Sequence, residues 1–295
     1  TVVITEDDFS RLDDGEFLND TIIDFYLKYI QDRLQRAHPE IASSTYIFNT
    51  FFYKRLTQRI NGVKGAFDNV KKWTAKVDLF SMKYVIIPIH ERAHWYLAVI
   101  VNLCELGKAK SASGAESGLS RLTCSRPVIF IFDSLKLRHN TVFRPLRDYL
   151  VAEAEDKRGI KIERDHIKSK YGYAPAQPNY CDCGVYVAHY VEAFLSKPEA
   201  FLPLLVDTQN SKKAVEQQLN RLWEIDQLGS KREHMQKVIL ELKKEVHSAG
   251  VDKYEALPMS DTGIVELMGP QVGPTHAETS EVMDASEGHV LSDSD

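Results

Sequence analysis

The 295-residue chain has few cysteines and none of the long apolar or basic segments that define several large classes of protein. Its four cysteines include Cys181 and Cys183, whose close spacing does not suit a disulfide framework, so a reducing compartment is expected. No stretch approaches the roughly 20 apolar residues of a membrane span, and the first residues lack the blocks of a secretory signal. These absences predict a soluble, intracellular protein without a membrane partner.

Charge is unevenly distributed along the chain. The net charge is −5, but residues 251–295 hold ten acidic residues and one Lys, which leaves a mildly basic body. Lys and Arg do not form the stripes typical of nucleic-acid binding, so no nucleic-acid partner is predicted. Residues 1–249 are expected to form one catalytic domain, and residues 250–295 a disordered acidic tail. A chain that begins at Thr1 is expected to be a segment of a longer polypeptide.

Apolar periodicity predicts the main elements of the body. A helix is expected from Asn19 or Asp20, because apolar residues recur on one face of TIIDFYLKYIQDRL. Three apolar, β-branched runs, at 84–89, 95–101 and 128–132, are typical of neighbouring buried strands.

The segment between the second and third runs differs from the rest of the body. Residues 105–126 are rich in Gly, Ser and Ala and lack periodicity, which predicts a flexible surface insertion. The helix that opens at Cys183 is apolar nearly all round and is therefore expected to be central. Other helices are predicted over 140–154, 211–227 and 230–247.

Cys183 has the surroundings of a reactive thiol. It follows Asp182, a candidate N-cap, so its sulfur would lie at the positive end of a helix dipole, where thiolate is favoured. The alternative is a small buried core residue, which is common for a free Cys. A thiol nucleophile also needs a base, a group that orients the base, and donors for the oxyanion.

Candidates for these roles occur at the ends of predicted strands and in one loop. His94 opens the second strand and Asp133 directly follows the third, so adjacent strands would bring imidazole and carboxylate together as base and orienting group. His90 competes with His94 as the base. Gln177 lies six residues before Cys183, and its amide and the Cys183 backbone N–H would serve as oxyanion donors.

The joint arrangement closely resembles the SUMO-specific (sentrin/Ulp) cysteine proteases. Their motifs are His-Trp at a strand start, Asp-Ser at a strand end, and Gln-x5-Cys within Asp-Cys-Gly. The similarity continues through EFLNDTIIDFYLKYI, FNTFFYKRL, VKKWTAKVDLF and VIIPIHERAHWYLAVI, and covers about residues 1–205. By this resemblance Cys183 is the nucleophile, His94 the general base, Asp133 its orienting group and Gln177 an oxyanion donor.

The resemblance also implies a substrate-binding tunnel between Phe17 and Trp95. In this family a narrow aromatic tunnel admits only a diglycine tail, because larger side chains would clash. Trp95 matches one wall. Phe17 stands where many members carry Trp, and together with the insertion it resembles the chain-editing branch. Core packing of both rings is the alternative.

The implied fold is α+β, of the papain-like/adenain-like cysteine-protease type, with a central mixed sheet flanked by helices. The implied activity is hydrolysis after the diglycine of SUMO, to deconjugate substrates or trim poly-SUMO chains. No metal or organic cofactor is expected, and the partners would be SUMO, SUMO-conjugated proteins or poly-SUMO chains, acted on by a nuclear monomer. The alternatives are a protease for another ubiquitin-like modifier and an acetyltransferase on the same fold, whose triad usually carries Glu where this chain has Asp133. A third is a catalytically dead SUMO-binding module, against which the intact catalytic positions argue.

Two further patterns concern metal binding and the tail. Cys181, Cys183 and His189 do not supply four suitably spaced ligands, so no metal site is predicted there. A four-residue segment of the tail resembles a SUMO-interacting motif, a short strand that adds to the edge of the modifier's sheet. Disordered filler is the other interpretation. The segment consists of Ile264, Val265, Glu266 and Leu267.

Overall fold

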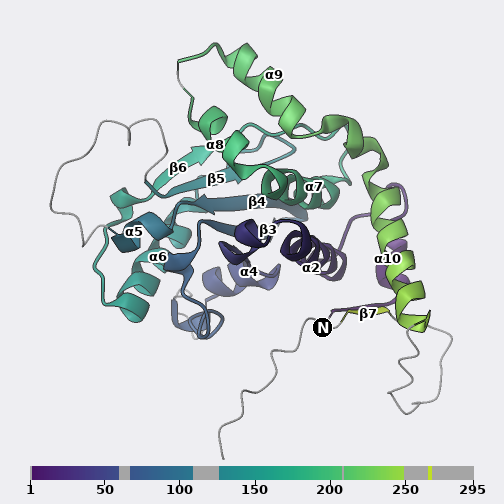
Figure 1. Ribbon diagram of the computed structural model, residues 1–295, viewed down its shortest axis with the longest axis horizontal. Helices are drawn as coiled ribbons and strands as arrows, with labels where there is room; N and C mark the ends of the chain where they lie inside the picture. Colours follow the sequence, from purple (N-terminus) through teal and green to yellow (C-terminus); the bar gives the residue numbers. More distant parts are fainter. Residues whose placement is uncertain (1, 60–66, 109–125, 208, 249–264, 268–295) are drawn as a thin grey trace, which may run out of the picture.

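A mixed five-stranded sheet lies at the centre of the protein, with helices on both faces (Figure 1). The computed structural model describes residues 2–59, 67–108, 126–207, 209–248 and 265–267. The strand order is β2-β3-β4-β5-β6, with the outer pairs β2/β3 and β5/β6 parallel and the two inner pairs antiparallel. The strands are β2 (Thr45–Ile47), β3 (Tyr84–Glu91), β4 (His94–Val101), β5 (Val128–Phe132) and β6 (Lys168–Tyr171).

The central strands are buried on both faces, which explains their nearly continuous apolar sequences. Successive side chains of a strand point to opposite faces, so each central strand contributes side chains to two hydrophobic cores. Leu97 and Phe130 pack with α2 (Asp20–Ala37) and α7 (Cys183–Ser196) on one face, whereas Ala98 and Ile129 pack with α4 (Phe51–Thr57) and α6 (Phe143–Arg158) on the other. The three predicted apolar runs are thus confirmed as adjacent buried strands.

Helices cover both faces of the sheet and complete the predicted α+β architecture. The helix predicted from Asn19 or Asp20 begins as expected, because the Asn19 side chain accepts a hydrogen bond from the Ile22 N–H at 3.0 Å. The helix that opens at Cys183 is almost entirely buried, and it packs against β4 and α2. The helices are α1 (Glu6–Ser10), α2 (Asp20–Ala37), α3 (Pro39–Ser43), α4 (Phe51–Thr57), α5 (Cys104–Lys108), α6 (Phe143–Arg158), α7 (Cys183–Ser196), α8 (Pro198–Val206), α9 (Lys212–Leu222) and α10 (Lys231–Ser248).

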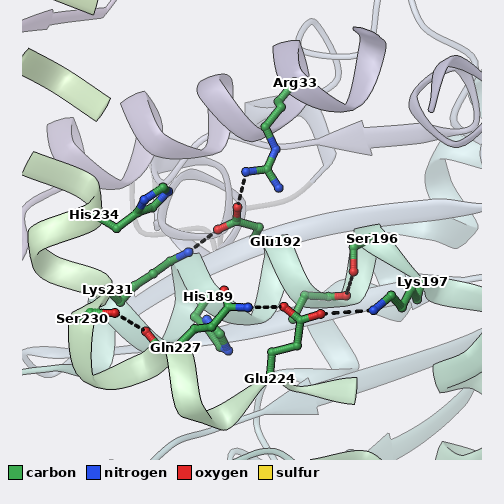
Figure 2. Close-up of a pocket in the computed structure, with 11 residues that line it drawn as sticks. Arg33, His189, Glu192, Ser196, Lys197, Glu224, Gln227, Ser230, Lys231 and His234 are labelled. Carbon is green, nitrogen blue, oxygen red and sulfur yellow. Dashed lines mark hydrogen bonds and ion pairs between the residues drawn. The ribbon is translucent and has the colours of Figure 1, made fainter. Parts of the chain in front are cut away.

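An ion network ties α7 to the helices beside it. Figure 2 shows Glu192 of α7 between Arg33 of α2 and Lys231 of α10, beside a cavity of about 380 Å³. The Arg33 and Glu192 side chains are 2.7 Å apart, and the Tyr26 hydroxyl donates to the same carboxylate at 3.0 Å. Burial would raise the pKa of Glu192, but the charge and hydrogen bond of Lys231 lower it. The paired carboxylate therefore fixes α7 between two neighbours.

The predicted insertion and tail are only partly described. Residues 104–108 form α5, and residues 109–125 lie outside the described residues. Of the predicted tail, Val265–Leu267 form a strand, β7, which pairs antiparallel with β1 (Val2–Ile4). Among the described helices, none is long and apolar enough to cross a membrane.

Candidate active site

His94 and Asp133 meet because of the way three strands are connected. Glu91 and His94 pair across a two-residue hairpin turn, and the turn residues Arg92 and Ala93 have φ of 53° and 58°. These left-handed values are those of a type I′ turn, whose twist matches that of the flanking strands. The turn places His94 at the start of β4, beside the end of the antiparallel β5. His94 Nε2 lies 3.1 Å from Asp133 Oδ2.

Cys183 adds a thiol to the His94–Asp133 pair. It is the first residue of α7 and is only 1% exposed. A hydrogen bond between its thiol and the His94 ring contributes to the raised pKa of His94, and His94 Nε2 faces Asp133. The predicted thiol, imidazole and carboxylate therefore form one hydrogen-bonded series, which is the arrangement that nucleophile activation requires.

Burial and hydrogen bonding oppose each other in this series. Burial alone would lower the pKa of His94, but the bonds to Asp133 and Cys183, and the charges of both, raise it to about 9. Burial would raise the pKa of Asp133, whereas hydrogen bonds from His139 and His94 hold it well below its usual range. The site thus favours an imidazolium beside an ionised carboxylate.

His90, the competing candidate for the base, lies elsewhere on the hairpin. Its ring stacks on Trp95 with centroids 4.4 Å apart, and burial lowers its pKa. Within the described residues, Asp133 is bonded to His94, His139 and the Leu135 N–H, and not to His90. The geometry therefore favours His94 as the base.

Gln177 is linked to the active site by a hydrogen bond from Ser134, the residue that follows Asp133. Its Oε1 accepts a hydrogen bond from the Ser134 hydroxyl at 2.5 Å, and its Nε2 donates to the Asn179 carbonyl at 2.7 Å. The side chain is thereby held in one orientation, with a second amide hydrogen left on Nε2. This is the group that the sequence predicts as an oxyanion donor.

Asp182 has a different role from the predicted one. It is the N-cap residue of α7, but its carboxylate makes no capping hydrogen bond. Instead its Oδ1 accepts a hydrogen bond from Arg232 Nε of α10 at 2.8 Å and lies 2.7 Å from Nη2 of the same buried guanidinium in an ion pair. A local pattern does not reveal this pairing, because the guanidinium comes from 50 residues away. The other bonds of this guanidinium go to four carbonyl oxygens, those of Arg11, Asp13, Glu16 and Cys181, at 3.1, 3.0, 2.6 and 3.5 Å.

The two predicted walls of the tunnel lie next to each other. Trp95 is 2% exposed, and its indole N–H donates to the Leu18 carbonyl at 3.0 Å. Phe17, directly before Leu18, is 49% exposed, so it is not a core residue. A Cβ on Gly184 would lie 2.9 Å from the Leu18 Cβ, so only glycine permits this close approach beside Cys183.

His139 is a member of the site that the sequence did not indicate. Its Nε2 contacts the same Asp133 Oδ2 that His94 contacts, and its ring stacks on Tyr96 with centroids 3.7 Å apart. The potential ligand atoms of His94, Asp133 and His139 lie within 4.8 Å of one another, a spacing that would also suit a metal ion. Both Nε2 atoms are directed at the carboxylate, so hydrogen bonding accounts for the cluster.

Two other sequence patterns are placed by the fold. His189 lies in the middle of α7, and its Nε2 is 2.5 Å from the Trp223 carbonyl, so it does not face Cys183. In the candidate SUMO-interacting motif, Val265, Glu266 and Leu267 form β7, and Ile264 lies outside the described residues.

A family comparison covers the segments that build this site. Residues 16–215 match a family model described as "Ulp1 protease family, C-terminal catalytic domain". The chain belongs to the Ulp1 protease family. The match includes Phe17, Trp95 and the four predicted catalytic positions, so the resemblance inferred from the motifs is confirmed.

Individual Ulp1-family relatives cover most of this chain. Ubiquitin-like-specific protease 2 of Schizosaccharomyces pombe is 36% identical over 261 residues, which are 83% of this chain and 41% of that protein. Human sentrin-specific protease 7 is 34% identical over 251 residues, which are 66% of this chain and 23% of that protein. These relatives agree with the chain-editing branch that the sequence resembles. The chain spans between about a quarter and two fifths of their lengths.

A solved structure supports the fold independently. A crystal structure of a de-sumoylating protease superposes with a TM-score of 0.69 at 28% identity, and the superposition covers 82% of this chain and 90% of that one. The predicted α+β cysteine-protease fold is confirmed.

Proposed function

We propose that the chain is a cysteine isopeptidase that cleaves after the C-terminal diglycine of SUMO and acts on SUMO conjugates or poly-SUMO chains. The observation that carries this proposal is the single hydrogen-bonded series of Cys183, His94 and Asp133, formed by residues from three separate segments. Membership of the Ulp1 protease family supports the same chemistry.

The series suits a two-stage hydrolysis. The Cys183 thiolate attacks the glycine carbonyl, and the Gln177 amide and the Cys183 backbone N–H stabilise the resulting oxyanion. The His94 imidazolium gives its proton to the leaving lysine amine, which departs and leaves a thioester on Cys183. Neutral His94 then takes a proton from water, which attacks the thioester and releases the glycine carboxylate and the thiol. Asp133 keeps the imidazole oriented in both stages.

The walls near Cys183 favour a tail without side chains. The Trp95 indole is fixed on the Leu18 carbonyl, and Leu18 itself packs against Gly184 at the start of α7. The Phe17 ring is exposed directly before this packed contact, and we infer that it forms the open wall of a passage that suits glycine. Two relatives are named for ubiquitin-like modifiers or sentrin, and a similar structure is of a de-sumoylating protease, which supports SUMO as the modifier and partner. We extend the proposal to a nuclear monomer.

The deciding experiment is covalent capture with a panel of ubiquitin-like modifiers that carry C-terminal electrophiles. SUMO is expected to label Cys183, and Cys183→Ala to abolish both labelling and hydrolysis, whereas Cys181→Ser retains most activity. His94→Ala should lose several powers of ten in rate and His90→Ala little. Capture of another modifier alone would reassign the substrate, and hydrolysis by Cys183→Ala at a wild-type rate would refute the mechanism. Acyl transfer to an amine in place of hydrolysis would indicate the acetyltransferase alternative.

We also propose that the tail supplies a second SUMO contact. Val265–Leu267 already adopt the extended conformation that strand addition uses. Replacing Ile264, Val265 and Leu267 with Ala should raise the poly-SUMO concentration needed for half-maximal rate by up to about a hundredfold, because a tethered second site raises effective concentration. A substrate with one modifier serves as the control and should be unaffected. Unchanged kinetics on long chains would refute the second contact.

A further inference from the structure

Asp133 holds two histidines on one carboxylate oxygen, and only one of them, His94, is bonded to Cys183. We propose that His139 is a positioning residue of the active site, whose ring N–H fixes Asp133 and shares its negative charge with His94. This inference rests on the proposed function, because it assigns a task within the same hydrolysis.

The surroundings of His139 fix the direction of its ring. It stacks nearly parallel on Tyr96, with an interplanar angle of 10°, and the Tyr96 hydroxyl is in turn bonded to Glu91. The side chain is 15% exposed and that of Asp133 only 3% exposed. A planar ring held against another ring can rotate little, so its Nε2 stays directed at the carboxylate. An ionised carboxylate only accepts hydrogen bonds, so His139 is the donor.

Sharing the oxygen has a definite electrostatic consequence. Each donor to an ionised carboxylate stabilises its negative charge and weakens its attraction for the next donor. His94 therefore interacts with a carboxylate that is already partly neutralised by His139. The His94 imidazolium is a better proton donor to the leaving amine than it would be beside an unshared Asp133.

Within the described residues, the His139 side chain is hydrogen-bonded to Asp133 alone, although other polar groups lie nearby. From β6, Tyr171 is hydrogen-bonded to the His139 backbone, and the Arg138 guanidinium lies 5.5 Å from the Tyr171 ring centroid. Lys136 interacts with the charge of Asp133 from the same loop. From β4, His94 lies with its ring centroid 6.1 Å from that of His139.

Two variants separate hydrogen bonding from ring packing. His139→Phe keeps a ring on Tyr96 but has no donor, whereas His139→Gln keeps an N–H near the position of Nε2 but has no ring. Both are compared with the wild type by hydrolysis of a fluorogenic SUMO substrate. The pH dependence of Cys183 alkylation by iodoacetamide is followed in parallel by mass spectrometry of the Cys183 peptide. Alkylation needs no substrate binding, so it reports on the thiolate–imidazolium pair itself.

We expect His139→Phe to lower kcat/KM about tenfold or more and to shift the alkaline limb of the alkylation profile to higher pH, because His94 then holds its proton more tightly. His139→Gln should stay within about threefold of the wild type with an unshifted profile. If the Phe variant melts at a lower temperature, His139→Asn, whose shorter amide does not reach Asp133, replaces it.

Equal behaviour of the donor and non-donor variants would overturn the proposal, whether both match the wild type or both are impaired. Cys183→Ala is assayed alongside to keep the two proposals distinct. Hydrolysis that persists in Cys183→Ala contradicts the proposed function, whereas loss of hydrolysis there with no difference between Phe and Gln contradicts only the role of His139.

Discussion

Gly184→Ala tests whether close packing behind the nucleophile controls activity separately from stability. The added Cβ would meet the Leu18 Cβ at 2.9 Å, Ile23 Cδ1 at 3.2 Å and Leu18 Cδ1 at 3.3 Å, so α7 or Leu18 must move. Overpacking of this kind costs about 1–3 kcal/mol. Ala is favoured over Gly in a helix by up to about 1 kcal/mol, which offsets part of that cost. We therefore expect the free energy of unfolding to fall by roughly 0–2 kcal/mol.

The expected effect on activity is larger than the effect on stability. Movement of α7 displaces Cys183 from His94, and movement of Leu18 displaces the Trp95 indole that it anchors. A misplacement of about 1 Å can cost about a hundredfold in rate. Hydrolysis of a fluorogenic SUMO substrate should accordingly fall about a hundredfold, while urea unfolding shows a stable, cooperative protein.

Gly229→Ala is the matched control. Its backbone is not left-handed, and no atom lies within 4 Å of the position that its Cβ would occupy. This variant should keep full activity and change the unfolding free energy by no more than about 0.5 kcal/mol. If Gly184→Ala kept its rate within threefold of Gly229→Ala, the close contact would not position the nucleophile.

Three further predictions concern a buried ion pair, pH and the insertion. Arg232→Ala should cost about 3 kcal/mol in urea unfolding, because it leaves a carboxylate and several carbonyl oxygens without their donor, whereas the exposed Lys237→Ala on the same helix should cost under about 1 kcal/mol; equal losses would contradict this. The raised pKa of His94 predicts stability that is complete below pH 6.5 and lost as pH rises through about 9, and the lowered pKa of Asp133 predicts stability that is lost on acidification below its usual value of 3.8. Measuring the free energy of unfolding at pH 7 and at pH 10 tests the prediction for His94. The variant His94→Ala should remove the difference between the two values. Deletion of residues 109–125, which spares α5 and its core-packed Leu106, should leave hydrolysis of a single-modifier substrate near normal, because the cost of closing a loop changes only slowly with its length. A loss on that substrate equal to the loss on chains would count against a chain-specific role.

The sequence predicted those features whose cause is local. The buried strands were predictable because their sequences are continuous apolar runs. His94 and Asp133 lie at the ends of two such strands, so their proximity follows from the pairing of those strands. Cys183 opens an apolar helix, so its place in the core was also predictable. In contrast, β6 is short and partly exposed, with the sequence KSKY, and offers no alternation to detect.

The features that were not predicted depend on distant partners. His139 has no motif of its own, and its role appears only when the turn after β5 folds back onto Tyr96. The Asp182 carboxylate was expected to cap α7, but it is instead bound by the Arg232 guanidinium in a charge-assisted hydrogen bond. No local pattern contains this information, because the competing donor is specified by a helix near the opposite end of the domain.

The contacts of Arg232 also determine when part of the active-site region can form during synthesis of the chain. Its guanidinium joins the loop at residues 11–16 to the segment before Cys183, and its bonds to that loop span 216 to 221 positions of sequence. Chains emerge at about 5–20 residues per second, so the loop waits roughly 10–40 s for this helix. Until then the segment before Phe17 has no fixed attachment to the nucleophile. The thiol at position 183 precedes Arg232 by only 49 residues, or roughly 2–10 s of synthesis, so the segment before Phe17 would be anchored shortly after the thiol is made.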